Sequence, residues 1–262
     1  MPNGKVDRRK MSAQVHIGTS GWHYKHWKGP FYSEDTGPEE MLGFYASRFS
    51  DAEINNSFYH LPEAGTLACW RDAVPEGFSF SVKASRYITH LKKLKDPQAP
   101  VAKFLERVEV LGKKLGPILF QLPPNWRPNP GRLKDFISCL PEGHRYVFEF
   151  RDPRWFDDQI YRLLEDSGAA FCIYHLAGAE SPKKVTGDFV YIRLHGPDAA
   201  YQGSYSPQDL SGWAGAISSW MRQGKDVYCF FDNDQSGYAP ADAMKLKEML
   251  SDYKEETDDE AQ

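Results

Sequence analysis

The chain has 262 residues, a formal net charge of −4 and 41% hydrophobic residues. This length allows one large domain or two small ones, and the apolar content allows a sizeable core. The net charge gives no overall electrostatic reason to expect binding to nucleic acid or to an anionic membrane surface. No apolar run approaches the roughly 20 residues of a membrane-spanning helix, so no membrane association is expected.

The cysteines are widely separated, and none of them belongs to a CxxC pair. Two of them lie within apolar strand-like runs. Scattered cysteines of this kind are more often buried free thiols in a reducing compartment than disulfides or zinc ligands. We therefore expect free thiols and a cytoplasmic location. The residues concerned are Cys69, Cys139, Cys172 and Cys229.

Short runs of aromatic and β-branched residues alternate with helical patterns along most of the chain. The expected strands are residues 15–20, 52–57, 78–84, 118–122, 146–152, 170–175, 189–195 and 227–232. The expected helices begin at Pro38, cover 66–74, 101–115, 132–140, 157–166 and 206–223, and resume at Pro240. Only the connection between the sixth and seventh strands lacks a clear helix.

Eight strands alternating with helices match the α/β class and the TIM (β/α)8 barrel in count and length. The alternative is a doubly wound sheet, but no GxGxxG motif follows the first strand. We expect a flexible leader over residues 1–13, a single barrel domain over 14–252 and a disordered acidic tail over 253–262.

The run 146–152 carries charge where a strand normally carries apolar atoms. Its alternation places Phe148 and Phe150 on one side, and Glu149 and Arg151 on the other. Isolated buried charges are very costly, so such groups are paired or used for function. Pro153 ends the run, which places both charges at the carboxyl end of the strand, where parallel α/β folds carry their chemistry.

Strand phase adds polar residues from other strands to the same axis. A buried ion-pair network that only fixes the packing is one interpretation of this cluster. However, natural barrel interiors are mostly branched and apolar, so a site that tunes pKa values in both directions is the favoured one. The residues that join Glu149 and Arg151 are Glu53, Asn55, Lys83, Gln121, Arg193, His195 and Asp232, with Asn233 competing for the role of Asp232.

Aromatic residues that follow strand ends are candidate walls for a ligand, because sugars and flat bases pack on such rings. Anchoring a loop to the barrel rim is an equally good explanation for any single one. They are Trp22, Tyr24, Trp27, Phe58, Tyr59, Trp126 and Trp155. The loop histidines His23, His26, His60 and His90 are more often surface residues than ligands.

Known catalytic motifs are missing from the sequence. It contains no HExxH, no P-loop and no GxSxG. A metal site built from Glu149, His195 and Asp232 is a lesser alternative, so no metal is assigned and the cofactor stays unknown.

Seven short motifs follow one another along the chain: Gly18-Thr-Ser-Gly-Trp22, Glu53-Ile-Asn55 with Phe58-Tyr59, Ile88-Thr-His90, Phe120-Gln-Leu-Pro-Pro124, Glu149-Phe-Arg151, Tyr191-Ile-Arg-Leu-His-Gly196 and Phe231-Asp-Asn-Asp234. In this order they resemble the DUF72 (YecE-like) family of TIM-barrel proteins. The likeness spans residues 15–250. It implies a barrel with a site at the strand carboxyl ends, and it implies no reaction. Asn55-Asn56-Ser57 and Asp152-Pro153 depart from the family pattern, so Asp152 does not take the role of the histidine that often follows the arginine.

We expect an enzyme that acts on a small polar ligand: a sugar, a phosphorylated compound or a nucleobase-containing molecule. Glu149 and His195 would transfer protons. Residues that would bind the substrate are Trp22, Asn55, Tyr59, Lys83, Gln121, Arg151, Arg193, Asp232 and Asn233, with the cationic ones holding anionic oxygens. The alternative is a non-catalytic module that binds a ligand or, against the net charge, nucleic acid in the same pocket. The sequence leaves the oligomeric state open.

Overall fold

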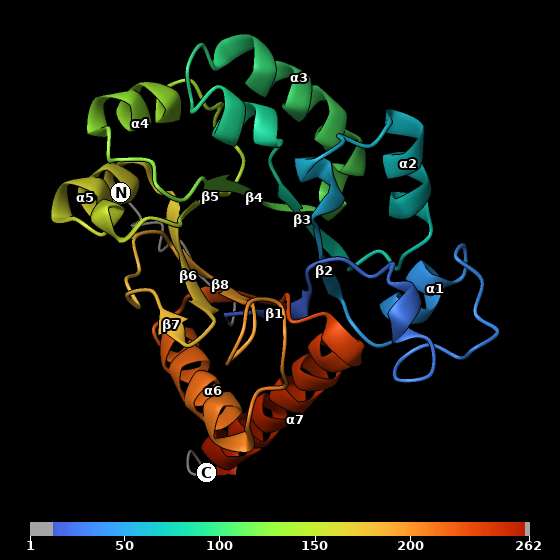
Figure 1. Cartoon of the computed structure of the whole chain (residues 1–262). Coiled ribbons are helices and arrows are strands. Elements are labelled where there is room, and N and C mark those ends of the chain that lie inside the picture. Colours follow the sequence, from blue (N-terminus) through green and yellow to red (C-terminus); the bar gives the residue numbers. More distant parts are fainter. Residues whose placement is uncertain (1–12, 260–262) are drawn as a thin grey trace, which may run out of the picture.

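A computed structural model describes residues 13–259 of the chain. Seven α-helices surround a ring of strands (Figure 1). The strands are β1 (Val15–Thr19), β2 (Asp51–Ile54), β3 (Ser79–Lys83), β4 (Leu115–Leu122), β5 (Tyr146–Phe150), β6 (Ala170–Leu176), β7 (Ala179–Glu180), β8 (Phe189–Leu194) and β9 (Asp226–Phe231). The helices are α1 (Met41–Ala46), α2 (Ala64–Asp72), α3 (Gln98–Val108), α4 (Pro130–Ile137), α5 (Asp158–Ser167), α6 (Pro207–Arg222) and α7 (Tyr238–Asp259).

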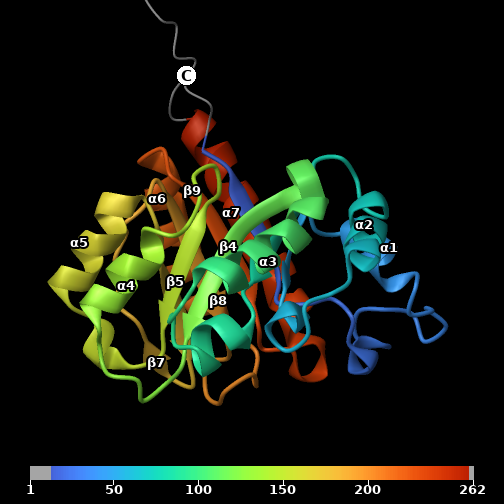
Figure 2. The same ribbon diagram turned by 90° about the horizontal axis from the view of Figure 1, so that it is seen from above.

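The predicted barrel is confirmed. Its strands run in the order β1-β9-β8-β6-β5-β4-β3-β2, and all neighbours in this order are parallel. The view in Figure 2 shows the strands side by side between helices. An isolated parallel bridge between Ser20 and Glu53 brings the ends of the order together. The barrel is therefore nearly closed, with its weakest seam between β1 and β2.

The side chains on the two faces of the ring form separate apolar clusters. The outer cluster packs against the helices and includes Phe80, Val82 and Ile192. The inner cluster includes Leu119, Val147 and Tyr191 in the lower part of the barrel. This division follows the alternation predicted from sequence. It leaves the layer of the interior at the carboxyl ends of the strands, called the upper layer below, for polar groups.

The seam between β1 and β2 depends on Gly18. A Cβ atom at this position would lie 2.0 Å from the Asp51 carbonyl oxygen and 2.9 Å from the Tyr45 hydroxyl. That hydroxyl links the two strands, because it donates to the Asp51 carbonyl at 2.9 Å and accepts from the Thr19 amide at 2.9 Å. The missing side chain thus lets the strands approach.

Gly18→Ala is expected to lower the free energy of unfolding by about 1–3 kcal/mol, the usual cost of overpacking a core. Urea denaturation measures the effect. Gly43→Ala is the matched control, because Gly43 is exposed in α1 with no atom within 4 Å of the added Cβ, and alanine favours helix. Equal stability of the two variants would contradict the role of the seam.

Three regions differ from the predicted elements. The helix expected at 101–115 ends earlier: α3 stops at Val108, a 3-10 helix over Glu109–Lys114 follows with Gly112 at φ 57°, and β4 begins at Leu115. The strand expected at 52–57 ends at Ile54, and a 3-10 helix follows over Asn56–Phe58. The connection from β6 to β8, for which the sequence showed no clear helix, contains the short antiparallel strand β7. The expected acidic tail begins within α7, which continues to Asp259, in keeping with the high helix propensity of Glu and Lys.

Both ends of the predicted domain organisation extend beyond the described residues. Residues 1–12 of the expected leader and residues 260–262 of the expected tail lie outside them. Within the described part, no helix is long and apolar enough to cross a membrane.

Candidate active site at the barrel mouth

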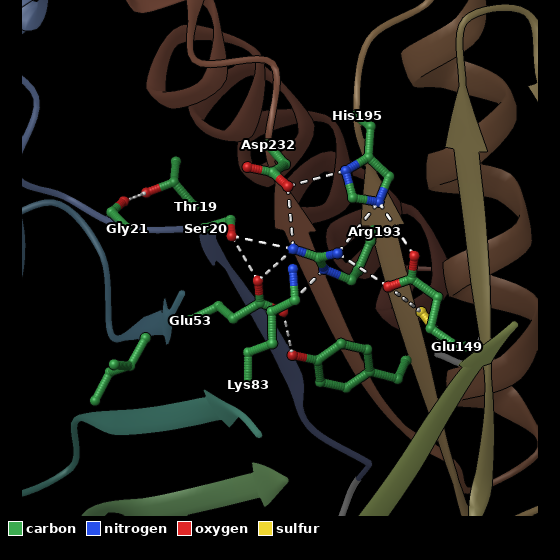
Figure 3. A network of polar contacts seen from close by, with 12 residues as sticks. Thr19, Ser20, Gly21, Glu53, Lys83, Glu149, Arg193, His195 and Asp232 are labelled. Atoms are coloured by element: carbon green, nitrogen blue, oxygen red, sulfur yellow. Dashed lines mark hydrogen bonds and ion pairs between the residues drawn. The ribbon is translucent and has the colours of Figure 1, made fainter. Parts of the chain in front are cut away.

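The centre of the upper layer is Arg193 on β8, whose side chain is fully buried. Its guanidinium donates to Glu53 of β2 at 2.6 and 3.0 Å. It also donates to Glu149 of β5 at 2.9 Å and to Asp232, which follows β9, at 3.0 Å. Ser20 accepts a further hydrogen bond at 3.2 Å. Figure 3 shows the guanidinium at the middle of this network, which therefore links four parts of the barrel.

A second cation, Arg151, closes one side of the network. Its Nε donates to one oxygen of Glu149, while Arg193 occupies the other oxygen. Its terminal nitrogen lies 2.8 Å from His195 Nε2. Because a guanidinium only donates, Nε2 must accept, and the ring proton lies on Nδ1. That proton is donated to Asp232 at 2.9 Å, so the contacts select the neutral ring.

The arginines set the charge of the carboxylates. Burial alone would raise the pKa of Glu149, but Arg151 and Arg193 outweigh it and hold this pKa well below its usual value. Asp232 follows the same pattern, with burial opposed mainly by Arg193. These groups therefore stay ionised in the physiological range, and each is fixed by charge-assisted hydrogen bonds.

Lys83 at the end of β3 behaves differently. Within the described chain its ammonium forms no ion pair, and it lies 4.4 Å from the centre of the Phe58 ring. Burial lowers the pKa of Lys83 from 10.5 to about 8, and the neighbouring charge of Arg193 acts in the same direction. The three nearby carboxylates are already engaged by guanidinium groups, which explains why Lys83 is left without a partner.

The remaining predicted residues lie in different places. Gln121 is in register with Glu149 and so lies at the same level of the barrel. The Asn233 amide donates to the Gly203 carbonyl and to Asp242, both at 2.9 Å, which fixes it away from the mouth. Trp22, Asn55 and Tyr59 instead line a cavity of about 590 Å³ beside the network. The structure thus brings the charged candidates together, and it places Trp22, Asn55 and Tyr59 in a separate cavity beside them.

Several aromatic residues proved to be loop anchors. Trp27 and Trp155 are fully buried, and their indole N–H groups donate to the backbone carbonyls of Asp234 and Trp126. Of the loop histidines, His23, His26 and His60 are exposed. His90 is half-buried, and burial together with Lys83 and Arg86 lowers its pKa to about 4.

Asp152 does not join the network. Its carboxylate caps the turn after β5 and pairs with Arg154 at 2.5 Å. The departure from the family pattern at this position therefore leaves a local ion pair between a buried carboxylate and a half-exposed arginine.

Sequence reasoning missed Ser20 and Tyr201. Ser20 accepts from Arg193 and donates to Glu53 at 2.5 Å. It belongs to the Gly18–Trp22 motif, and inward phase on β1 could have identified it. Tyr201 lies on the loop after β8, with its ring edge-on to His195 at 5.6 Å between centroids. No strand pattern covers that loop, so sequence gave no signal for Tyr201.

The carboxylates and His195 are arranged around cations and not around a vacant centre. Over residues 13–251, no group of three or more His, Cys, Asp or Glu is placed to hold a metal ion. The four cysteines are free: Cys172 and Cys229 are buried, Cys139 is half-buried and Cys69 is exposed.

Fold and network together define a TIM-type barrel with an arginine-centred ion network at the carboxyl ends of its strands. The chain belongs to the family described as "Protein of unknown function DUF72", which it matches over residues 16–262.

Two solved structures share the fold. The DUF72 family protein of Thermotoga maritima superimposes with a TM-score of 0.83 at 27% identity, covering 91% of this chain and 99% of that one. The DUF72 family protein of Enterococcus faecalis gives 0.79 at 19% identity, covering 91% and 96%. In sequence, the UPF0759 protein YunF of Bacillus subtilis is 24% identical over 282 residues, covering 90% of this chain and 94% of YunF.

Proposed function

We propose that the protein is a cytoplasmic enzyme that acts on a small polar, anionic ligand by acid–base chemistry at the barrel mouth. One observation carries this proposal: Lys83 is a buried amine with no ion-pair partner among the described residues, and its pKa of about 8 lies near physiological pH. An acid–base catalyst works best when its pKa is close to the operating pH. The free thiols support the cytoplasmic part of the proposal.

The other charged residues fit supporting roles. Arg151 keeps 8% of its side chain exposed and Asp232 keeps 6%, so both border the mouth. Arg151 can hold an anionic oxygen of the ligand. Glu149 and His195, predicted from sequence as proton-transfer groups, both have their polar atoms engaged by Arg151, Arg193 or Asp232. Their contacts favour the positioning of Arg151 over direct proton transfer.

The test compares wild type with Lys83→Met in a metabolite extract analysed by mass spectrometry. The wild type is expected to deplete a polar anionic compound and form a product, while the variant retains at most about 1% of that rate. Lys134→Met, at an exposed position on α4, is the control and should keep full activity. Equal depletion by Lys83→Met would contradict the role of Lys83.

A pH series distinguishes this loss from damage to the fold. The folded pKa of about 8 lies below the ordinary 10.5, so the unfolded chain binds more protons between these values and stability rises with pH there. Lys83→Met removes the cost of holding a protonated amine in this buried place. The free energy of unfolding of the variant minus that of wild type should therefore be on the order of 3 kcal/mol larger below pH 8 than at pH 10.5. A misfolded variant would instead be less stable than wild type at every pH.

The second candidate is a ligand-binding module without turnover. The self-contained pairing of the network favours it, because Arg193 and Arg151 already engage Glu53, Glu149 and Asp232 without a substrate. In the same extract such a module would retain a compound unchanged on the protein. That result would replace the catalytic proposal by the binding one.

A further inference from the structure

The cavity beside the network has a wall composition of its own. It has a volume of about 590 Å³ and lies between the loops after β1 and β2 and the helices α1 and α2. This volume is typical of a site for a small organic molecule. Its residues are largely apolar or aromatic, and the only formally charged one among them is Glu39.

The aromatic residues form a preorganised corner. The rings of Trp22 and Trp70 meet edge to face, with centroids 5.0 Å apart and an interplanar angle of 85°. Trp22 is nearly buried and Trp70 is half-buried, so the second indole keeps part of its surface for a ligand. Leu42 and Ile54 are buried apolar residues of the same cavity. A flat ring fits such a wall by offset or edge-on packing.

The electrostatics of the cavity oppose an anion. Glu39 is exposed, and none of the described residues that line the cavity is a lysine or an arginine. Burial raises the pKa of Tyr24, another lining residue, and the charges of Asp232, Asp234 and Glu53 raise it further. Burial is the largest cause, and the three carboxylates add a negative potential at the Tyr24 hydroxyl that the charge of Arg193 only partly opposes.

The cavity also contains a hydrogen-bond acceptor that is unsatisfied by the described residues. Asn55 lines the cavity, and its buried carboxamide oxygen accepts no hydrogen bond from the described residues. Leaving such an atom unpaired is costly, and a ligand N–H would satisfy it after a rotation of the amide.

We propose that this cavity binds a flat aromatic ring whose polar end is a cationic or neutral nitrogen donor, and that it rejects the corresponding anion. The proposal stands on the cavity alone and does not depend on the reaction proposed for the mouth. If Lys83→Met proved to have no effect on activity, the proposal for the cavity would still stand. If the cavity proved not to bind these ligands, the proposal for Lys83 would still stand.

Three probes with the same ring and different charge test the proposal: phenethylamine, 2-phenylethanol and phenylacetate, titrated by calorimetry into the full-length protein. The amine is expected to bind most tightly, the alcohol next, and the carboxylate least, with at least about a tenfold difference between amine and carboxylate. Tightest binding of phenylacetate, or no saturable binding of the amine, would overturn the proposal.

Cys69 supplies a local readout, because it is an exposed free thiol of the cavity wall. Bound phenethylamine should slow the alkylation of Cys69 by iodoacetamide severalfold. Cys139, which is half-buried and outside the cavity, is the internal control and should react at an unchanged rate. Equal slowing of both thiols, or of neither, would place the probe elsewhere.

Two variants locate the contacts. Trp70→Ala should weaken binding of the amine and the alcohol about tenfold, since it removes ring packing. Glu39→Gln, at an exposed position, should leave the alcohol unaffected and weaken the amine about threefold, as expected for an exposed charge pair. If Glu39→Gln instead changed all three probes equally, the charge preference would be refuted.

Discussion

Arg193→Met is expected to lower the free energy of unfolding by roughly 3–5 kcal/mol at pH 7, the usual effect of breaking a buried ion pair from one side. The side chain is fully buried and donates to Glu53, Glu149 and Asp232. Without it, Glu53 and Asp232 lose their guanidinium partner. Since a whole domain has only about 5–15 kcal/mol of stability, urea denaturation will show the change clearly.

The pH dependence of this deficit follows from the pKa directions. Burial raises the pKa of Asp232 and Glu149, and Arg193 is among the charges that hold both below their usual values. In the variant the effect of burial is less opposed, so the pKa values of both carboxyl groups rise. Their protonation at lower pH then relieves the repulsion between the buried carboxylates. The deficit relative to wild type should therefore shrink between pH 7 and pH 5.

Arg154→Met is the matched control for the loss of an arginine. Arg154 pairs with Asp152 but keeps half of its side chain exposed, and Asp152 keeps its hydrogen bond from the Arg154 backbone amide in the variant. The loss should therefore be about 1 kcal/mol, near that of a solvated pair. A deficit below 1 kcal/mol for Arg193→Met, or one that grows at pH 5, would show that the network does not hold the barrel mouth together.

The barrel was predictable from sequence because alternation fixes which side chains face inward. Phe148 and Phe150 identified the outer face of β5, so Glu149 had to face the axis, and β8 placed Arg193 by the same rule. Eight such strands left few arrangements. The boundaries were less certain: the apolar pattern continued to residue 115, whereas α3 ends at Val108 and a 3-10 helix with Gly112 at φ 57° follows it.

The internal organisation of the site was not predictable from one strand at a time. Which carboxylate meets which guanidinium depends on the register around the whole ring. It is this pairing that leaves Lys83 without an anion and with a lowered pKa. The cavity with Trp22 and Asn55 needs α2, which contributes Trp70 from a segment with no visible functional pattern.

Glu149→Gln is expected to lower the free energy of unfolding by about 3–5 kcal/mol, because it removes the charge that two guanidinium groups share. Glu149 has no exposed surface, and its oxygens accept from Arg151 and Arg193. The glutamine keeps the shape but offers one oxygen and one N–H group, and that N–H would face a guanidinium donor. Thermal and urea denaturation measure the change, with Glu109→Gln as the control in an exposed pair with His144.

The same variant separates the two roles of Glu149. A large fall in the midpoint assigns the carboxylate to holding Arg151 and Arg193 in place, and ligand binding then weakens only as a consequence. An unchanged or higher midpoint would contradict this expectation. It would show that the carboxylate stores unfavourable electrostatics, as active-site groups do, and would return Glu149 to the proton-transfer role predicted from its place on the strand. Adding Lys83→Met to Glu149→Gln sharpens the distinction, because removing one cation from the mouth should restore part of the lost stability if the deficit comes from unbalanced positive charge.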